Sequence, residues 1–252
     1  MHNLGQTRSS HQHNHLLLTP DTFVRTTLPG MKKASAIVHV GPAVGARFTE
    51  YSVEFEAQGE LGPATAQRFL YVLEGEILLE ADGQRRELCP RGYAYLGQGL
   101  AHHAVARQQS RIVVVEKHYV PTDGLAATRL LVSNEDTMES HPLDEDPDLQ
   151  VKCLLPDDPQ FDFAVNTMVY QPGAALSMVE MHVMEHGLLM LEGGGIYRLG
   201  DSWYPVKAGD FIWMGPWCPQ WFGAIGKKPA KYLIYKDWNR HPLSSHHDEF
   251  RR

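Results

Sequence analysis

The chain of 252 residues has few cysteines, and its three, Cys89, Cys153 and Cys218, are odd in number and widely spaced. With no CxxC pair, the sequence offers neither a disulfide framework nor a cysteine-based zinc site, and a reducing compartment is expected. No apolar run approaches the roughly 18 residues of a membrane-spanning helix. The first twenty residues lack the cationic start and apolar core of a secretory signal. We therefore expect a cytoplasmic protein without a membrane partner.

Basic stretches are also missing. The chain has 23 Lys and Arg against 30 Asp and Glu, for a formal net charge of −7. This balance excludes a protein that binds the phosphate backbone of nucleic acids through a basic surface. The hydrophobic share of 43% is that of an ordinary globular protein, as one large domain or two of roughly 100 residues. Composition alone therefore names no function.

Short apolar runs are present instead, separated by Gly, Pro or Asp-Gly. The run 111–118 is β-branched and too short for a helix, and Asp82-Gly83 between two runs predicts a hairpin turn. The pattern predicts an all-β fold, either a sandwich or a barrel. The expected strands are 35–40, 48–55, 69–73, 76–80, 93–96, 111–118, 161–170, 188–191, 195–198, 211–214 and 231–235.

The second half of the chain repeats features of the first. Residues 73–77 match 191–196 at an offset of 118, and 91–95 match 208–212 at an offset of 117. Two blocks in the same order indicate an internal duplication. The acidic, proline-interrupted stretch between the halves is typical of a linker. We predict a flexible His-rich tail at 1–25, a first barrel at 26–125, an acidic linker at 126–158 and a second barrel at 159–252.

The densest group of polar residues in apolar surroundings lies at 177–193. On a strand, Glu180, His182 and His186 have the same parity and share one face. Burying a carboxylate and two imidazoles is costly unless something coordinates or pairs them, so a divalent metal is the economical explanation. Gln220 follows a strand and a proline-constrained turn, and it is the predicted ligand from a second strand.

Two other interpretations of these residues stay open. On a helix, 182–186 spell H-x-x-E-H, the inverted zinc-peptidase motif with Glu185 as the base, although Gly187 and the glycines at 193–195 disfavour a helix. In a packed barrel, the three side chains are unrelated and individually hydrogen-bonded. If the segment is a strand, Glu185 has the opposite parity and is expected to be structural or to orient a histidine.

The spacing of these residues resembles the motifs of the cupin superfamily. Glu180, His182 and His186 stand where the first motif has ligands, with a glycine seven residues further on. Gln220 stands eleven residues after Gly209, the place of the last ligand in the second motif. The order Glu, His, His, Gln instead of His, His, Glu, His resembles the (S)-ureidoglycine aminohydrolase family of bicupins. Other stretches similar to that family are 28–30, 179–187, 203–206, 209–213, 219–222 and 235–240.

The resemblance implies a fold and an activity. The fold is two tandem cupin barrels, each a double-stranded β-helix or jelly roll. The activity is a metal-dependent hydrolysis of (S)-ureidoglycine to (S)-ureidoglycolate and ammonia, a step of purine and allantoin breakdown. The implied metal is Mn²⁺, held by Glu180, His182, His186 and Gln220, although other divalent ions suit such a donor set. A homo-oligomer is expected, because cupin barrels commonly pair through exposed sheet edges.

The resemblance also implies substrate contacts. Lys236 and Tyr232 match catalytic positions, and Tyr197 is a further pocket residue; Glu180 and Gln220 are counted with them as substrate-binding. Lys236 is expected to neutralise the substrate carboxylate or relay a proton, and Tyr232 to donate its hydroxyl. Without the resemblance, both tyrosines are equally well explained as core aromatics and Lys236 as a surface partner of Asp237.

The first half departs from the family pattern. Alignment of the two halves puts Gly62, Ala64 and Arg68 at the places of Glu180, His182 and His186, and His103 at that of Gln220. One ligand of four cannot hold an ion, so the first barrel is predicted to be metal-free. Two rival functions remain. One is a non-catalytic bicupin that binds a small acid. The other is a cupin dioxygenase or decarboxylase, but those enzymes usually have His, His, Glu and His as ligands, so Glu180 and Gln220 disfavour it.

Overall fold

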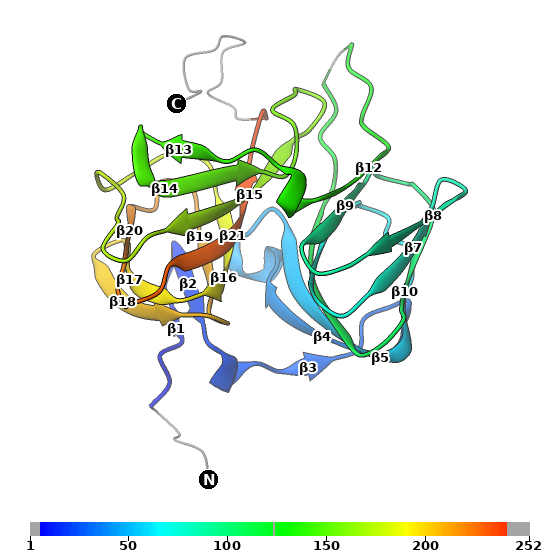
Figure 1. The fold of residues 1–252 in the computed structure, drawn as a ribbon, viewed down its shortest axis with the longest axis horizontal. Helices are drawn as coiled ribbons and strands as arrows, with labels where there is room; N and C mark the ends of the chain where they lie inside the picture. Colours follow the sequence, from blue (N-terminus) through cyan, green and yellow to red (C-terminus); the bar gives the residue numbers. More distant parts are fainter. Residues whose placement is uncertain (1–5, 123, 241–252) are drawn as a thin grey trace. The chain divides into compact units, whose positions relative to one another are not determined.

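The computed structural model describes residues 6–122 and 124–240, and within them strands and three short 3-10 turns account for all regular structure (Figure 1). The predicted all-β fold is confirmed. None of the described residues belongs to a helix long and apolar enough to cross a membrane. The chain divides into two compact units, which we call the first barrel (residues 22–138) and the second barrel (residues up to 21 together with those from 139 onward).

The first barrel is built on a ten-stranded antiparallel sheet in the order β12-β9-β6-β11-β5-β10-β7-β8, with β4 pairing β5 and β3. Alternate residues such as Tyr51, Val53 and Phe55 face its core. The predicted hairpin is present, since Ala81 pairs with Gln84 across a two-residue turn. The strands are β3 (Arg25–Thr26), β4 (Met31–Val40), β5 (Thr49–Leu61), β6 (Gln67–Glu74), β7 (Ile77–Ala81), β8 (Gln84–Leu88), β9 (Gly92–Leu96), β10 (His102–Ala106), β11 (Ser110–Lys117) and β12 (Leu130–Asn134).

The second barrel combines an eight-stranded sheet, β1-β2-β19-β16-β21-β15-β14-β13, with a three-stranded sheet, β18-β17-β20. Its core includes Leu188, Ile212 and Ile234 from neighbouring strands. The strands are β1 (Ser10–His11), β2 (His15–Leu18), β13 (His141–Leu143), β14 (Asp146–Cys153), β15 (Phe163–Tyr170), β16 (His186–Glu192), β17 (Gly194–Leu199), β18 (Ser202–Lys207), β19 (Phe211–Met214), β20 (Gln220–Ala224) and β21 (Ala230–Asp237).

The topology agrees with an internal duplication. In the first barrel β11 lies between β5 and β6, and in the second barrel β21 lies between β15 and β16. On the side away from its hairpin with β8, β7 pairs with β10, where Ala81 lies opposite His102. In the second barrel β17 pairs with β20, where Leu199 lies opposite Gln220. The residue at the place of Gln220 is therefore His102, and the expectation of His103 is wrong by one position. Counting from the glycine failed because the segment before β20 is one residue longer.

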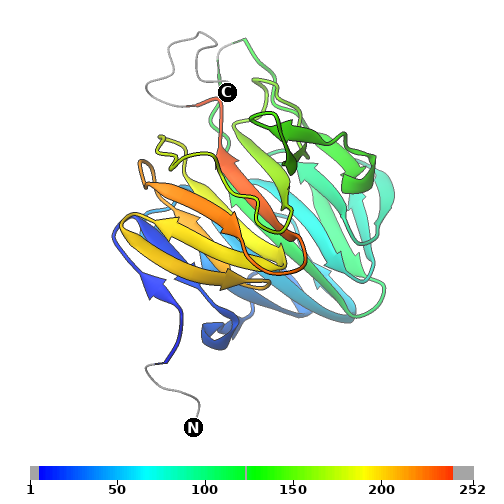
Figure 2. The same ribbon diagram turned by 60° about the vertical axis from the view of Figure 1, so that its left-hand side comes forward.

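Residues 6–21, which we call the strap, belong to the second barrel. The sequence suggested a flexible tail here, but β2 pairs with β19 from Leu18 opposite Phe211 to His15 opposite Met214. Figure 2 shows the dark blue strap beside the yellow strands of this barrel. The physical reason is the apolar run at 16–18, because Leu17 is fully buried in the core. Residues 1–5 of the expected tail lie outside the described residues.

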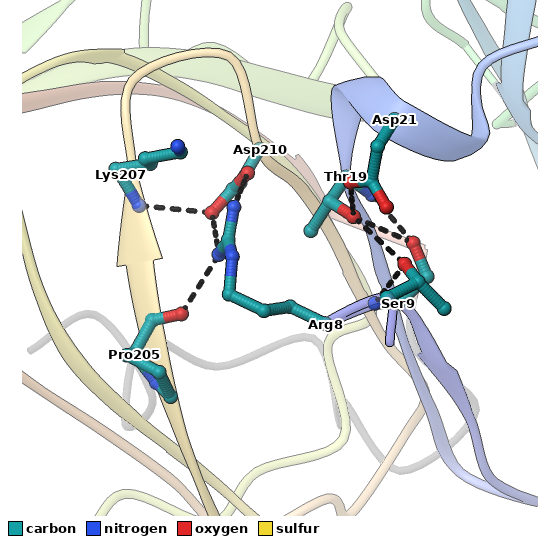
Figure 3. Close-up of polar contacts among 8 residues, drawn as sticks. Arg8, Ser9, Thr19, Asp21, Pro205, Lys207 and Asp210 are labelled. Carbon is teal, nitrogen blue, oxygen red and sulfur yellow. Dashed lines mark hydrogen bonds and ion pairs between the residues drawn. The ribbon is translucent and has the colours of Figure 1, made fainter. Parts of the chain in front are cut away.

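Polar contacts hold the strap as well (Figure 3). The guanidinium of Arg8 donates to both carboxylate oxygens of Asp210, at 2.6 and 2.8 Å, and to the carbonyl of Pro205 at 2.9 Å. The Asp210 side chain is fully buried. The hydroxyls of Ser9 and Thr19 are 2.8 Å apart. The buried carboxylate of Asp210, which directly precedes β19, is thus neutralised by a cation on the strap.

The expected acidic linker is also largely built into the sheets. It contains β12 of the first barrel and β13 and β14 of the second, and the two units divide between Met138 and Glu139. Apolar residues among the acidic ones explain this, since Leu149 is 2% exposed and pairs with Tyr170 on β15. Of the predicted second barrel, residues 241–252 lie outside the described residues.

Candidate metal and substrate site

His186 is the first residue of β16 and is buried between two neighbouring strands, pairing with Met214 on β19 and Lys236 on β21. Its Nδ1 lies 3.2 Å from the carbonyl oxygen of Tyr235 and donates to it. This contact leaves the lone pair on Nε2, the arrangement that a metal-binding histidine requires. The Nε2 atom faces Nε2 of His182 at 3.3 Å.

His182 does not share a strand with His186, so the predicted single strand face is wrong. Of the segment 177–185 before β16, Glu180 alone forms a β-bridge, with Gln220, through backbone bonds of 2.8 and 2.9 Å. The His182 carbonyl accepts from the amide of Trp217 at 2.8 Å, and Trp217 has a positive φ of 63°. The loop before β16 and the turn before β20 therefore hold each other by main-chain bonds, which parity counting does not see.

Three side-chain groups converge at one point. The amide nitrogen of Gln220 lies 2.7 Å from Nε2 of His182, which in turn faces His186. Since an amide presents either its oxygen or its nitrogen by turning over, Gln220 suits a metal as well as an imidazole. The Nδ1 atom of His182 is buried and makes no hydrogen bond with the described residues. The structure thus brings together three of the four predicted ligands.

The pKa values of both histidines suit ligation. Burial lowers the pKa of His186 well below its ordinary value, and the charges of His182 and Lys236 add to this. Burial and Lys236 also lower the pKa of His182. Both imidazoles are therefore neutral at pH 7, as metal ligands must be.

Glu180 is the fourth predicted ligand. Burial raises the pKa of its carboxyl, while the charge of Lys236 acts in the opposite direction. Among the residues that the structure describes, no three His, Cys, Asp or Glu side chains gather as a metal-binding group. The donor chemistry nevertheless fits a divalent ion, because two imidazole nitrogens, one amide and a nearby carboxylate are ordinary ligands of Mn²⁺ and its neighbours.

Lys236 lies on β21 opposite His186. Burial lowers the pKa of its ammonium, whereas Cys153 and Glu180 raise it. With its amide turned to satisfy both of its groups, Asn166 on β15 presents its oxygen 3.1 Å from Lys236 Nζ. Asn166 was not among the predicted site residues, although a polar residue within the apolar run of β15 was the available signal. The Nζ atom of Lys236 thus contacts Asn166 and lies 5.9 Å from the ring centre of Trp238, and no ion pair with Asp237 is formed among the described residues.

Two predicted tyrosines line the interior of the same barrel. Tyr197 and Tyr232 are 1% and 2% exposed, and burial raises the pKa of each well above its ordinary value, so both stay neutral phenols. The charge of Glu180 contributes to both shifts. The hydroxyl of Tyr232 is 2.7 Å from that of Tyr170, a residue that the sequence analysis did not single out.

Glu185 is directed away from the histidine pair. Its carboxylate accepts from Nε1 of Trp213 at 3.3 Å, and its backbone carbonyl accepts from the amide of Asp237. The group that orients His186 is the carbonyl of Tyr235. Residues 182–185 lie in a loop, so the alternative of a zinc-peptidase helix is excluded.

The corresponding place in the first barrel holds an arginine. Arg68 donates to Glu116 Oε1 at 2.6 and 2.8 Å, to the Gly62 carbonyl at 2.7 Å, and lies 2.8 Å from Nε2 of His102. Tyr51 donates to the same glutamate oxygen at 2.8 Å. Burial lowers the pKa of His102 to about 4, so its imidazole accepts from the guanidinium. Here a side-chain cation satisfies the surrounding acceptors.

Comparisons with known proteins find a cupin domain and relatives among the (S)-ureidoglycine aminohydrolases. Residues 166–235 match the family described as "Cupin domain". A "Probable (S)-ureidoglycine aminohydrolase" of Oryza sativa subsp. japonica is 40% identical over 95% of this chain and 78% of its own length. The (S)-ureidoglycine aminohydrolase of Escherichia coli is 34% identical over 90% of this chain and 89% of its own length.

Solved structures give the same result. The crystal structure of protein Ylba from E. coli has a TM-score of 0.83 and 32% identity, with coverage of 94% of this chain and 96% of that one. An oxalate decarboxylase of Bacillus subtilis has a TM-score of 0.70, with coverage of 93% of this chain and 80% of that one. Its sequence is 10% identical, so this likeness shows the fold alone. With two cupin barrels and relatives at this identity over most of its length, the chain belongs to the (S)-ureidoglycine aminohydrolase family.

Proposed function

We propose that this chain hydrolyses (S)-ureidoglycine to (S)-ureidoglycolate and ammonia, and that a divalent ion, Mn²⁺ by preference, is held by Glu180, His182, His186 and Gln220. In this reaction the bond between the central carbon and its amine breaks and a bond from that carbon to water oxygen forms. The departing amine takes up a proton and leaves as ammonia. The resulting alcohol keeps the ureido group and the carboxylate.

The observation that carries this proposal is the convergence of His182, His186 and Gln220 beside a half-buried lysine, Lys236. The facing Nε2 atoms are 3.3 Å apart, and the amide lies 2.7 Å from one of them. An ion held there supplies Lewis-acid polarisation and a template for a small chelating acid. Neutral imidazoles and an amide leave a net positive site for an anionic substrate.

Lys236 supplies a positive charge near this point. Because Asn166 holds the ammonium and the charge of Glu180 favours it, Lys236 binds the substrate carboxylate or passes a proton to the leaving amine. Its depressed pKa brings it closer to the range in which an ammonium gives up a proton. Tyr232 and Tyr197 remain protonated and act as hydrogen-bond donors, not as bases.

The two rival functions lead to different measurements. A non-catalytic bicupin would bind a small acid without turnover, and a dioxygenase would consume oxygen. Membership of the family and the position of Lys236 opposite His186 support the hydrolase. The likeness to oxalate decarboxylase supports the fold and no activity.

The decisive experiment is ammonia release from freshly generated ureidoglycine, with elemental analysis of the same protein sample. We expect Mn²⁺-dependent ammonia release without oxygen uptake, and loss of turnover after chelation. Ammonia release that is unaffected by complete metal removal would contradict the metal requirement, and oxygen uptake without ammonia would contradict the reaction. A homo-oligomer and a cytoplasmic location stay predictions, to be tested by light scattering and by fractionation.

A further inference from the structure

Tyr170, the hydrogen-bond partner of Tyr232, has no role in the reaction proposed above. Tyr170 is the last residue of β15 and is fully buried. Its ring contacts the rings of Phe222 at 4.9 Å and Tyr232 at 5.5 Å between centroids. These two aromatic rings fix its position in the core of the second barrel, and its hydroxyl lies 2.7 Å from that of Tyr232.

The pair contains two hydroxyl protons, but only one of them can lie between the two oxygens. Among the described residues, Tyr232 is the hydrogen-bond partner that the structure gives to the hydroxyl of Tyr170. If Tyr232 donated in this bond, the proton of Tyr170 would be left unpaired inside an apolar core, at a cost of about 1–3 kcal/mol. If Tyr170 donates, the proton outside this hydrogen bond is the hydroxyl proton of Tyr232. Tyr232 is the residue expected to contact the substrate, so that proton has the substrate as its partner.

We propose that Tyr170 is a positioning residue: its hydroxyl donates to the oxygen of Tyr232 and so directs the Tyr232 O–H into the substrate site. This inference rests on the proposed function. Burial raises the pKa of both phenols, so that both protons are present at neutral pH. A hydroxyl that accepts one hydrogen bond is also a stronger donor in the next, because chains of hydrogen bonds polarise one another.

The test is a double-mutant cycle with Tyr170→Phe, Tyr232→Phe and the double variant, each loaded with Mn²⁺ and assayed for ammonia release. We expect Tyr170→Phe to lower kcat/KM roughly fivefold to tenfold, the loss typical of one neutral hydrogen bond. In the Tyr232→Phe background the second substitution should change kcat/KM by less than about twofold. A residue that merely supports the core would give additive losses in the cycle.

Tyr95→Phe is the matched control, because it removes a buried tyrosine bond of the same length, 2.7 Å to Gln67, from the first barrel. It should lower the melting temperature and leave kcat/KM unchanged. Calorimetry with the product (S)-ureidoglycolate gives a second readout, in which Tyr170→Phe should weaken binding only while Tyr232 is present. Wild-type kinetics and wild-type product affinity in Tyr170→Phe would overturn this role alone. An inactive wild-type protein would overturn the proposed function as well.

Discussion

Arg68 in the first barrel and His186 in the second occupy the same place in two copies of one sheet. Arg68 pairs with Glu116 across β6 and β11, and His186 pairs with Lys236 across β16 and β21. The charges differ between the copies. The cation Arg68 of the first barrel corresponds to the neutral imidazole of His186, and the anion Glu116 corresponds to the cation Lys236. The first barrel therefore carries its own positive charge where the second is proposed to hold an ion.

Metal content should follow this difference. We expect about one divalent ion per chain by elemental analysis, and His186→Ala should lose both the ion and turnover, because an ion held by four protein groups loses a central donor. His103→Ala is the matched control, since that half-exposed histidine of the first barrel contacts Glu60 at 3.2 Å. Two ions per wild-type chain, or equal loss of metal in both variants, would contradict the assignment.

Lys236→Ala should separate metal binding from turnover. The ammonium is held by Asn166 and is not a predicted ligand, so the variant should keep its ion while kcat falls at least a hundredfold. Lys231→Ala, five residues earlier on β21, removes a charge of the same kind away from this cluster and should behave like the wild type. Full activity of Lys236→Ala would remove the lysine from the reaction.

The strap should contribute to the stability of the second barrel. Arg8→Ala leaves the fully buried carboxylate of Asp210 without its bidentate cation and should lower the free energy of unfolding by about 1–3 kcal/mol. Arg25→Ala removes an exposed pair with Glu54 and should cost less than about 0.5 kcal/mol. Chemical denaturation of both variants measures the difference. Equal losses would show that the strap is held by β2 alone.

Glu50 should make stability depend on pH. Its carboxyl is 1% exposed, one of its oxygens has no hydrogen-bond partner among the described residues, and burial raises its pKa from 4.5 to about 8. A raised pKa means that the folded state binds the proton more tightly than the unfolded state. The resulting stability is complete below pH 4.5 and is lost as the pH rises towards 8.

Glu50→Gln, which keeps the shape and removes the ionisable group, should abolish this decline, worth on the order of a few kcal/mol across the interval. Glu54→Gln is the control of opposite sign. The hydrogen bond from Arg25 lowers the pKa of Glu54, so its contribution is lost as the pH falls. Unfolding curves between about pH 3 and 8.5 compare the variants, because the contribution of Glu54 changes only below pH 4.5 and that of Glu50 only above it. An unchanged slope in Glu50→Gln would show that other groups cause the dependence.

Much of the fold could be predicted from the sequence, because strand formation depends on local patterns. The β-branched run that became β11, the Asp82-Gly83 turn and the offset of 118 between the halves all rest on neighbouring residues. The residues of the candidate site could be proposed from the sequence as well, since polar groups in an apolar stretch need partners wherever they are buried. Glu180, His182, His186 and Gln220 stood out for that reason.

Only the tertiary structure decided which of these groups meet and what holds them. His182 reaches His186 from a loop that is bonded to the turn before β20, and Asn166 and Tyr170 reach Lys236 and Tyr232 from another strand. The strap and the linker were misjudged for the same reason. Their few apolar residues give no clear period. Each segment became a strand by pairing with another strand, β2 with the distant β19 and β14 with the following β15, because its backbone groups gain hydrogen-bond partners there.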